Sequence, residues 1–461
     1  MARAALTPGV VARAPLAICT KLQAAGHEAV VVGGAVRDHL LGRPIAEWDV
    51  ATSARPPEVQ ALFRKTIPTG LQHGTVTVLE RGEGGDAVAV EVTTYRGEGA
   101  YTDARRPDSV VFGVPLVEDL ARRDFTINAI AYDPVKDVVV DPHGGQVDLD
   151  AGLIRAVGDP VLRFGEDGLR VMRAVRFAAT LELAIEPATL AAIPTALGAL
   201  AKVSAERVQV ELLKMLGARQ PSRGLAPAMT SGILGVVLPE LVEGVGVIQN
   251  RHHTHDVWEH TIATVDATPG DAIVRLGALL HDVAKPRTAA PKPDAPGEHT
   301  FYRHDVVGAD MAEVILKRLK LSNRDRERVV ALVLHHMFWY TPEWTDATVR
   351  RFVKRVGADT LPELFALRQG DVVGRGRGED PEVELGELRR RVDGVLAADA
   401  ALTTRDLAID GGDVMKTLGI APSRRIGQLL EALLEKVIDD PALNERERLL
   451  TLLVELHGTM P

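Results

Sequence analysis

Residues 30–52 read VVVGGAVRDHLLGRPIAEWDVAT, and this stretch decides the fold. The pattern predicts a strand, a Gly-Gly turn, a short helix and a second strand that carries Glu47 and Asp49. Residues two apart on a strand point to the same face of a sheet, so the two carboxylates should converge. Gly33 and Gly34 leave room for an anion to approach the backbone where the helix begins. Carboxylates for a magnesium ion beside a phosphate cradle indicate metal-assisted phosphate chemistry.

A third acid, Glu91, supports this interpretation. It lies in AVAVEVTTYR (87–96), whose apolar character predicts a buried central strand. A carboxylate in such a strand is costly unless it is paired or binds a metal. The alternative is an ordinary helix start at Gly33–Gly34, with Glu47 and Asp49 on a solvated face.

Five segments, in order along the chain, carry a family resemblance. They are GGAVRD (33–38) with the strand EWDVAT (47–52), GEGAYTDARRPDSVVF (97–112), ARRDFTINAIAYD (121–133), RFGEDGLRVMRAVRFAA (163–179) and SAERVQVELLKML (204–216). Together they resemble the metal strand, flexible loop, sugar-binding motif, nucleotide-selecting helix and following helix of the tRNA nucleotidyltransferase and bacterial poly(A) polymerase superfamily. The resemblance implies a head like that of DNA polymerase β.

We therefore expect an α+β fold, with a mixed sheet and helices in the N-terminal head and an all-α remainder. Strand patterns cover Val30–Val32, Trp48–Thr52, Val76–Glu80, Val88–Thr94 and Ile127–Tyr132, whereas helical spacing dominates later, as in Glu206–Leu216 and Ala309–Leu319. Residues 286–299 have the composition of an exposed loop. The expected domains are a head at 1–150, a neck at 151–225, an HD-type helical domain at 226–378 and a helical tail at 379–461.

The resemblance also implies roles for residues of the head. Glu47, Asp49 and Glu91 are expected to act in catalysis, with Glu47 and Asp49 as ligands of Mg²⁺. The nucleotide is expected to contact Gly34, Arg37, Arg123, Asp124, Asp167, Arg170 and Arg173. The implied reaction uses two Mg²⁺ ions, an RNA 3′-hydroxyl as nucleophile and pyrophosphate as leaving group, with no protein nucleophile.

Hydrogen-bonding groups indicate how Asp167 and Arg170 would select a base. Residues three apart in a helix share a face. A carboxylate only accepts and a guanidinium only donates, which matches the amino group and ring nitrogen of cytosine and adenine but not uracil or guanine. This pair would select CTP and ATP without a nucleic-acid template. The alternative is an ordinary ion pair between the two side chains within one helix.

One position departs from the family's pattern. The metal strand usually carries Asp-x-Asp, and this chain has Glu47-Trp48-Asp49. Glutamate keeps the charge but moves the carboxylate one methylene further out, so the backbone or the rotamer must shift to suit the octahedral geometry of Mg²⁺. We expect Glu47 still to bind metal.

Nine of the fourteen histidines lie between positions 252 and 336, and this concentration indicates a second metal site. The adjacent pair His281-Asp282 resembles the signature of HD-type metal phosphohydrolases. The resemblance implies one or two divalent ions (Ni, Mn, Fe, Zn or Mg) bound by His260, His281, Asp282 and Asp371, with His304, His335 and His336 as further candidates. The alternative is an HD fold with little or no hydrolase activity.

Composition sets outer limits on the class of protein. No apolar run approaches the length of a membrane span, and the N-terminal segment, interrupted by Arg and Pro, does not resemble a secretory signal. The single cysteine, Cys19, excludes an intramolecular disulfide and favours the cytoplasm. The net charge of −9 is a global sum, and nucleic-acid binding needs only a local basic face. The expected partners are the tRNA acceptor stem, ATP and CTP, and no association with a membrane is expected. The sequence indicates no particular oligomeric state.

Three functions are open at this point. The first is CCA addition to tRNA 3′ ends, with an appended HD hydrolase. The second is a poly(A) polymerase, or an enzyme that adds only A or only CC. The third is mainly an HD phosphohydrolase with a degenerate head, given Glu47. The complete segment 97–112 disfavours a CC-only enzyme, and the histidine cluster disfavours a dedicated poly(A) polymerase.

Overall fold

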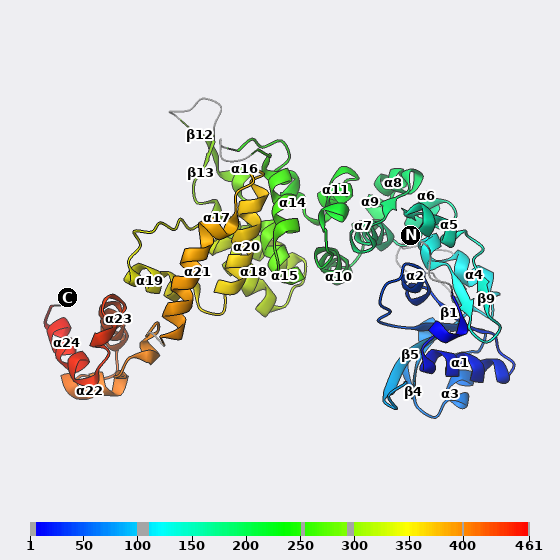
Figure 1. The fold of residues 1–461 in the computed structure, drawn as a ribbon, viewed down its shortest axis with the longest axis horizontal. Helices are drawn as coiled ribbons and strands as arrows, with labels where there is room; N and C mark the ends of the chain where they lie inside the picture. Colours follow the sequence, from blue (N-terminus) through cyan, green and yellow to red (C-terminus); the bar gives the residue numbers. More distant parts are fainter. Residues whose placement is uncertain (1–5, 99–109, 250–253, 293–298, 399–400, 460–461) are drawn as a thin grey trace. The chain divides into compact units, whose positions relative to one another are not determined.

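A computed structural model describes residues 6–98, 110–249, 254–292, 299–398 and 401–459 of the 461-residue chain. The chain forms two compact units, Met1–Pro239 and Glu240–Pro461. The first unit contains the mixed sheet and the second is almost entirely helical (Figure 1). The expected α+β class is confirmed. The finer division into four domains stays a prediction.

In the described part of the first unit, seven strands form one mixed sheet in the order β3-β4-β5-β2-β1-β8-β9. Their bounds are β1 Ala29–Val32, β2 Asp49–Thr52, β3 Thr66–Gly70, β4 Thr75–Arg81, β5 Ala87–Thr94, β8 Ala131–Asp133 and β9 Val138–Val140. The β2–β5 pair is parallel, and the other neighbouring pairs are antiparallel. The parallel pair brings two distant parts of the sequence into register at the site described below.

The core of the head lies on both sides of β1. All four residues of this strand, AVVV, are buried, as expected for an inner strand that is covered on both faces. Helix α1 (Arg13–Ala24) packs against β1 and β4 and buries Ile18, Cys19 and Leu22. The head also contains α2 (Gly34–Leu40), α3 (Pro56–Leu62), α4 (Leu116–Ala121) and α5 (Gly145–Ala151) (Figure 1).

Four of the five expected strands are present to within one residue, and the fifth is partly wrong. Of Ile127–Tyr132, only Ala131–Tyr132 belongs to a strand, because Thr126–Asn128 forms a 3₁₀ turn that buries all three residues. The expected loop at 286–299 is also partly wrong. It includes Ala289–Pro291 (β12), which pairs antiparallel with His299–Phe301 (β13).

Beyond residue 160 most of the regular secondary structure in the described chain is helical, and the strands there are short. In the first unit the helices include α6 (Pro160–Glu166), α7 (Leu169–Leu181), α10 (Ala205–Leu216) and α11 (Ser222–Thr230), and α7 packs against both α10 and α11. The second unit contains α14 (Val257–Ala267), α15 (Ala272–Leu280), α17 (His304–Arg318), α18 (Asn323–His335), α19 (Asp346–Val356), α20 (Leu361–Gly374) and α21 (Pro381–Ala397). None of the helices in the described ranges combines the length and apolar character that crossing a membrane requires.

The C-terminal helices form an apolar cluster of their own. They are α22 (Gly411–Leu418), α23 (Arg424–Asp439) and α24 (Arg446–Thr459). Leu429, Leu433 and Val437 of α23 are buried together with Leu449 and Leu453 of α24. The spacing of three or four residues along each helix explains this seam.

Candidate functional site

The paired carboxylates of the head lie on neighbouring parallel strands. Asp49, the first residue of β2, is aligned with Glu91 of β5 and, on its other side, with Val32 of β1. Aligned residues on neighbouring strands point to the same face of a sheet. The Asp49 and Glu91 carboxylates therefore share one face.

Glu91 is exposed, so the expectation of a fully buried strand is wrong. Val90, Val92 and Thr94 are buried, while Glu91 stands on the opposite face. Although β5 is an inner strand, only one of its faces is covered along this stretch. The carboxylate is therefore open to a ligand arriving from solvent.

Glu47 lies outside the strand, contrary to the expectation that it shares β2 with Asp49. The strand begins at Asp49, whose partner Val32 is the last residue of β1. After Val32 the chain turns at Gly33, so β1 offers no partner that would extend the ladder to Glu47. Glu47 is exposed, and the three head carboxylates are not among the groups of described residues whose ligand atoms all lie within 4.8 Å.

Electrostatics nevertheless link the acids. Burial raises the pKa of Asp49 above its ordinary value, and the negative charges of Glu91 and Glu47 raise it further, while Arg123 lowers it. Crowded carboxylates of this kind suit a divalent cation, which relieves their repulsion and accepts oxygen ligands.

The turn at Gly33 brings the backbone close to this site. Its φ of +71° lies in a region that L-residues rarely adopt, and a Cβ there would come within 3.0 Å of Arg123 Nη1 and 3.9 Å of Asp49 Oδ2. Gly34, the first residue of α2, follows directly. The backbone conformation thus favours glycine here, and a Cβ would also crowd the end of the Arg123 side chain.

Arg37 and Arg123 meet at Asn128. Arg37 Nη1 donates to Asn128 Oδ1 at 2.6 Å, and Arg123 Nη1 donates to the Asn128 carbonyl oxygen at 3.3 Å. Arg123 also pairs with Asp119 at 3.4 Å. The 3₁₀ turn at residues 126–128 therefore positions two cations beside the Gly33 turn.

The buried Asp124 forms an ion pair with the half-buried Arg173. Arg173 Nε donates to Asp124 Oδ2 at 2.6 Å, and Asn128 Nδ2 donates to Asp124 Oδ1 at 3.0 Å. Burial would raise the pKa of Asp124, but the Arg173 charge and the Asn128 hydrogen bond outweigh it and lower the pKa to about 2. Asp124 stays ionised at any physiological pH.

Asp167 and Arg170 are not on one helix, and their side chains have other charged partners. Helix α6 ends at Glu166 and α7 begins at Leu169, so Asp167 lies in an extended link. Its Oδ1 accepts from the Leu169 N–H at 3.0 Å, and its Oδ2 pairs with Arg207 of α10 at 2.6 Å. Arg170 instead pairs with Glu166 and donates to the Arg122 carbonyl oxygen at 3.0 Å. The alternative of an ordinary ion pair within one helix is wrong.

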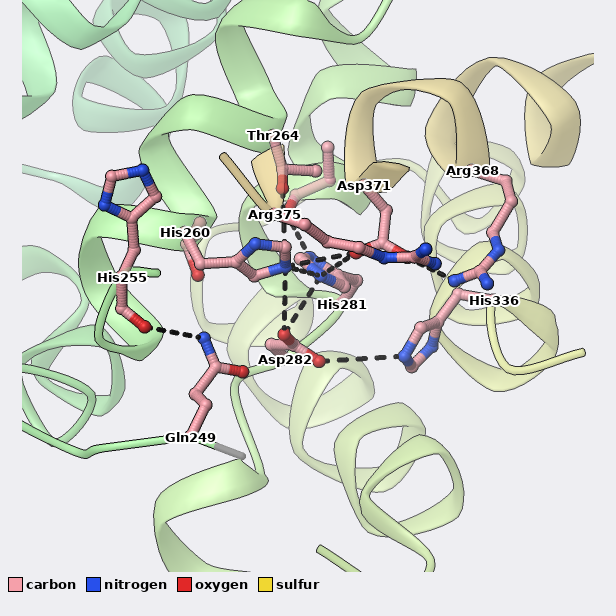
Figure 2. Close-up of polar contacts among 12 residues, drawn as sticks. Gln249, His255, His260, Thr264, His281, Asp282, His336, Arg368, Asp371 and Arg375 are labelled. Carbon is pink, nitrogen blue, oxygen red and sulfur yellow. Dashed lines mark hydrogen bonds and ion pairs between the residues drawn. The ribbon is translucent and has the colours of Figure 1, made fainter. Parts of the chain in front are cut away.

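Six buried side chains converge in the second unit. They are His260, His281, Asp282, His304, His336 and Asp371. Figure 2 labels all of them except His304. They form two groups, His260, His281 and Asp371, and Asp282, His304 and His336, with the ligand atoms of each group within 4.8 Å of one another. The predicted ligands His260, His281, Asp282, His304 and Asp371 are thus brought together from four helical segments, and His336 comes from a fifth, the end of α18.

Asp282 connects the two groups. Its Oδ2 lies 3.1 Å from His281 Nε2 and 3.4 Å from His260 Nε2, while its Oδ1 lies 3.4 Å from His304 Nε2 and 3.7 Å from His336 Nε2. In Figure 2 dashed lines join one Asp282 oxygen to His260 and the other to His336. A carboxylate placed in this way can bind two metal ions, one through each oxygen.

Backbone carbonyl groups orient three of the imidazoles. The Nδ1 atoms of His281, His304 and His336 lie 2.7, 2.7 and 2.6 Å from the carbonyl oxygens of Ala278, Phe301 and Val333. A donated Nδ1–H leaves Nε2 without a proton and directed at the cluster, which is the form that binds metal. Burial, with the neighbouring His281 and His304, holds the pKa of His336 well below its ordinary value, so this ring is neutral.

Cations neutralise the two acids of the cluster. Lys285 Nζ lies 2.5 Å from Asp282 Oδ2, and Arg368 pairs with Asp371. Burial raises the pKa of Asp282, but His281 and Lys285 outweigh it and keep this pKa well below the ordinary value. The acids are therefore ionised, as metal ligands must be.

His335 lies outside the cluster, and its neighbour His336 takes the place predicted for it. His335 is the last residue of α18, and its half-buried side chain belongs to neither group. Consecutive residues of a helix point in directions about 100° apart, so only one of the two can face the cluster.

Sequence reasoning missed Arg207, Lys285 and Arg368. Lys285 and Arg368 each had a local signal, because each lies three residues from an acid of the cluster, Asp282 and Asp371 respectively. Arg105, Arg106 and most of the predicted flexible loop (97–112) lie outside the described residues.

Three family models match the chain. They are the poly A polymerase head domain over residues 29–155, the RNA and SrmB-binding site of polymerase A over residues 182–244, and tRNA nucleotidyltransferase domain 2 over residues 304–453.

Individual relatives agree with these models. The chain is 36% identical to a CCA-adding enzyme of Limosilactobacillus fermentum over 95% of this chain and 96% of that one. It is 50% identical to a CCA-adding enzyme of Levilactobacillus brevis, where the match spans 46% of this chain and about half, 52%, of the relative. A crystal structure of a Bacillus stearothermophilus CCA-adding enzyme in complex with CTP superimposes with a TM-score of 0.73 at 31% identity, over 96% of this chain and 97% of that chain.

Proposed function

The chain belongs to the family of CCA-adding enzymes, and on that premise we propose that it adds CCA to tRNA 3′ ends from CTP and ATP without a nucleic-acid template. The observation that carries this proposal is the in-register pair Asp49 and Glu91, set beside the Gly33 turn and Arg123. The likeness to the CTP complex extends over nearly the whole chain, which supports the same activity here and disfavours a degenerate head.

Enzymes of this class use a divalent metal, and we infer that the metal is Mg²⁺. Asp49 and Glu91 would hold it, with Glu47 approaching from the segment before β2. Their oxygen ligands and mutual repulsion fit a hard divalent cation. A bound metal would activate the RNA 3′-hydroxyl and neutralise charge on the leaving pyrophosphate.

The remaining groups bind and orient the nucleotide. Gly34 and Arg37 lie at the start of α2, where backbone N–H groups and a guanidinium suit a triphosphate. Arg123 and Asp124 would contact the ribose and phosphates, and the ion pair between Asp124 and Arg173 keeps both side chains in place. Asp167 and Arg170 would read the base, since one accepts the amino proton and the other donates to the ring nitrogen.

The decisive experiment supplies tRNA that ends at the discriminator base, at C or at CC, with CTP and ATP given separately. Ordered addition of C, C and A supports the proposal, whereas long A tails would identify a poly(A) polymerase. Asp49→Ala should lower the addition rate by at least about 100-fold, because a metal ligand is lost. Its thermal stability should be unchanged or slightly higher, because burial and like charges disfavour the ionised Asp49 in the folded state.

Asp86→Ala is the matched control. Asp86 is an exposed acid in the turn between β4 and β5, away from the shared face of Asp49 and Glu91. Its substitution should leave addition unchanged. An Asp49→Ala enzyme that adds CCA at the rate of this control would contradict the proposed site.

A second function is favoured by the buried His/Asp cluster. We propose that His260, His281 and Asp371 hold one divalent ion, that His304 and His336 hold another, and that Asp282 serves both. The cluster consists of six buried groups of the kinds that bind metals, and three of its imidazoles are oriented by backbone carbonyl groups. This arrangement favours a site for Ni, Mn, Fe, Zn or Mg over a purely structural cluster. Such ions activate water for phosphate-ester hydrolysis.

Metal analysis tests this second proposal. The purified protein should hold close to two equivalents of divalent metal and hydrolyse 2′,3′-cyclic AMP when supplied with nickel or manganese. Asp282→Asn should lose both ions, because an amide is a poor ligand and has one acceptor oxygen. His335→Ala changes the residue next to His336 that lies outside the cluster, so this variant should keep both ions. A folded wild-type protein that takes up no metal would end the proposal.

A further inference from the structure

The cavity beside the His/Asp cluster is larger than a phosphate group requires. Its volume is about 1060 Å³, and Asp282, His304 and His336 lie on its wall. Pockets that enclose small organic ligands measure about 300–1000 Å³. The space therefore suits a phosphate ester with a substantial organic part.

Two large aromatic side chains line this cavity and remain exposed. Trp339 is 75% exposed and Tyr302 is 84% exposed. They come from separate segments, since Tyr302 lies between β13 and α17 and Trp339 follows α18. Neither contributes to the core, so packing does not account for them. An exposed aromatic ring beside a phosphate-binding site is a surface on which a planar base can stack.

The residue next to Tyr302 supports a ligand site on the same wall. Arg303 has φ +61°, a left-handed conformation that L-residues rarely adopt, and it directly precedes His304. Strained backbone of this kind concentrates at functional sites. Arg303 lines the cavity on the same chain segment as His304, a proposed metal ligand.

The cations at the cluster end of the cavity are already paired with acids. Lys285 pairs with Asp282, Arg368 with Asp371 and Glu384, and Arg375 with Glu379 and Glu384. A phosphate at this end would therefore be attracted by the proposed divalent ions, while the aromatic side chains offer contacts for a base.

We propose that Trp339 and Tyr302 form a stacking subsite for the base of a nucleoside phosphate whose phosphate lies at the His/Asp cluster. The proposal rests on the second function above and adds which side chains hold the organic part of the substrate. Two sources share this chemistry, a free nucleotide and the 3′-phosphorylated end of an RNA strand.

The test measures binding to the full-length protein by calorimetry in the presence of Mn²⁺. Uridine 5′-monophosphate and ribose 5-phosphate differ only in the base, and uracil is a base that the head is proposed to reject. Uridine monophosphate should bind about 5- to 150-fold more tightly, as expected for one or two stacking contacts. Trp339→Ala should lower its affinity toward that of ribose 5-phosphate, and Trp339→Phe should retain most of it.

Val383→Ala is the control, because Val383 is an exposed cavity residue without an aromatic ring. It should leave the ratio of the two affinities unchanged, and all variants should keep CCA addition, which shows that they fold. Equal affinities in the wild type, or an unchanged ratio in the Trp339→Ala/Tyr302→Ala double variant, would overturn the subsite.

Two further measurements separate the sources and the underlying function. A short 3′-phosphorylated oligouridylate that binds more tightly than uridine monophosphate identifies an RNA end, and the reverse order identifies a free nucleotide; either order supports the subsite when Trp339→Ala weakens both. Metal uptake without base-dependent binding removes only the subsite. Base-dependent binding without metal uptake supports the subsite and removes the hydrolase.

Discussion

Asp167 illustrates how a single carboxylate can serve both structure and selection. It caps the start of α7 through the Leu169 N–H and pairs with Arg207, the third residue of α10. A carboxylate offers about four acceptor positions, so these two partners leave capacity for the amino group of cytosine or adenine. If Asp167 reads the base as proposed, Arg207 would set the orientation in which the two meet.

Arg207→Ala should relax base choice, because Asp167 loses the charged hydrogen bond that orients it. We expect kcat/KM for UTP relative to CTP to rise about tenfold, a change that corresponds to one charge-assisted hydrogen bond. Steady-state kinetics with CTP, ATP and UTP measure the ratio. Arg207→Lys should restore most of it, since a single N–H contact carries the pair.

Lys214→Ala provides the comparison, because Lys214 is an exposed cation on the same helix. A purely structural role for Arg207 would lower kcat/KM for all three nucleotides equally and leave their ratio unchanged, which would refute the orientation argument.

At the scale of elements, the junction of β1 and α2 organises the head. The strand ends at Val32, the chain turns at Gly33, and α2 begins at Gly34. Asp49 is aligned with Val32, so the same turn that begins the helix also limits the strand that carries the proposed metal ligand. The position of Glu47 outside β2 follows from this geometry.

Gly33→Ala should destabilise the protein by about 1–3 kcal/mol, because the added Cβ forces an L-residue into a backbone region that is nearly exclusive to glycine. It should also raise KM for the nucleotide, since the Cβ comes within 3.0 Å of Arg123 Nη1. Thermal unfolding and initial rates of addition measure the two effects.

Gly26→Ala distinguishes the effect on stability from the effect on KM. Gly26 has φ +90°, and a Cβ there meets nothing within 4 Å among the described atoms. It should share the loss of stability but not the change in KM. Equal KM values for the two variants would show that crowding of Arg123 is unimportant.

At the scale of the whole molecule, each site is assembled inside one compact unit. The head carboxylates, Asp167 and Arg207 belong to Met1–Pro239, and all six members of the His/Asp cluster belong to Glu240–Pro461. The fold class and the strands around Asp49 and Glu91 were predictable, because alternating and continuous apolar runs report local burial. The short strands β9, β12 and β13 could not be predicted from the sequence, because a pattern of three residues is too short to show the alternation of a strand.

The sequence by itself determined the order of motifs, the α+β class, the carboxylates Asp49 and Glu91 and the adjacent pair His281-Asp282, since all of these depend on short spacings along the chain. Only the tertiary structure decided that Glu47 lies before the strand, that Asp167 pairs with Arg207 and that His336 rather than His335 joins the cluster. It also decided that Asp282 faces two groups of ligands. The physical reason is that these contacts join elements distant in sequence. Their geometry depends on how the helices pack and on where the pairing between neighbouring strands ends.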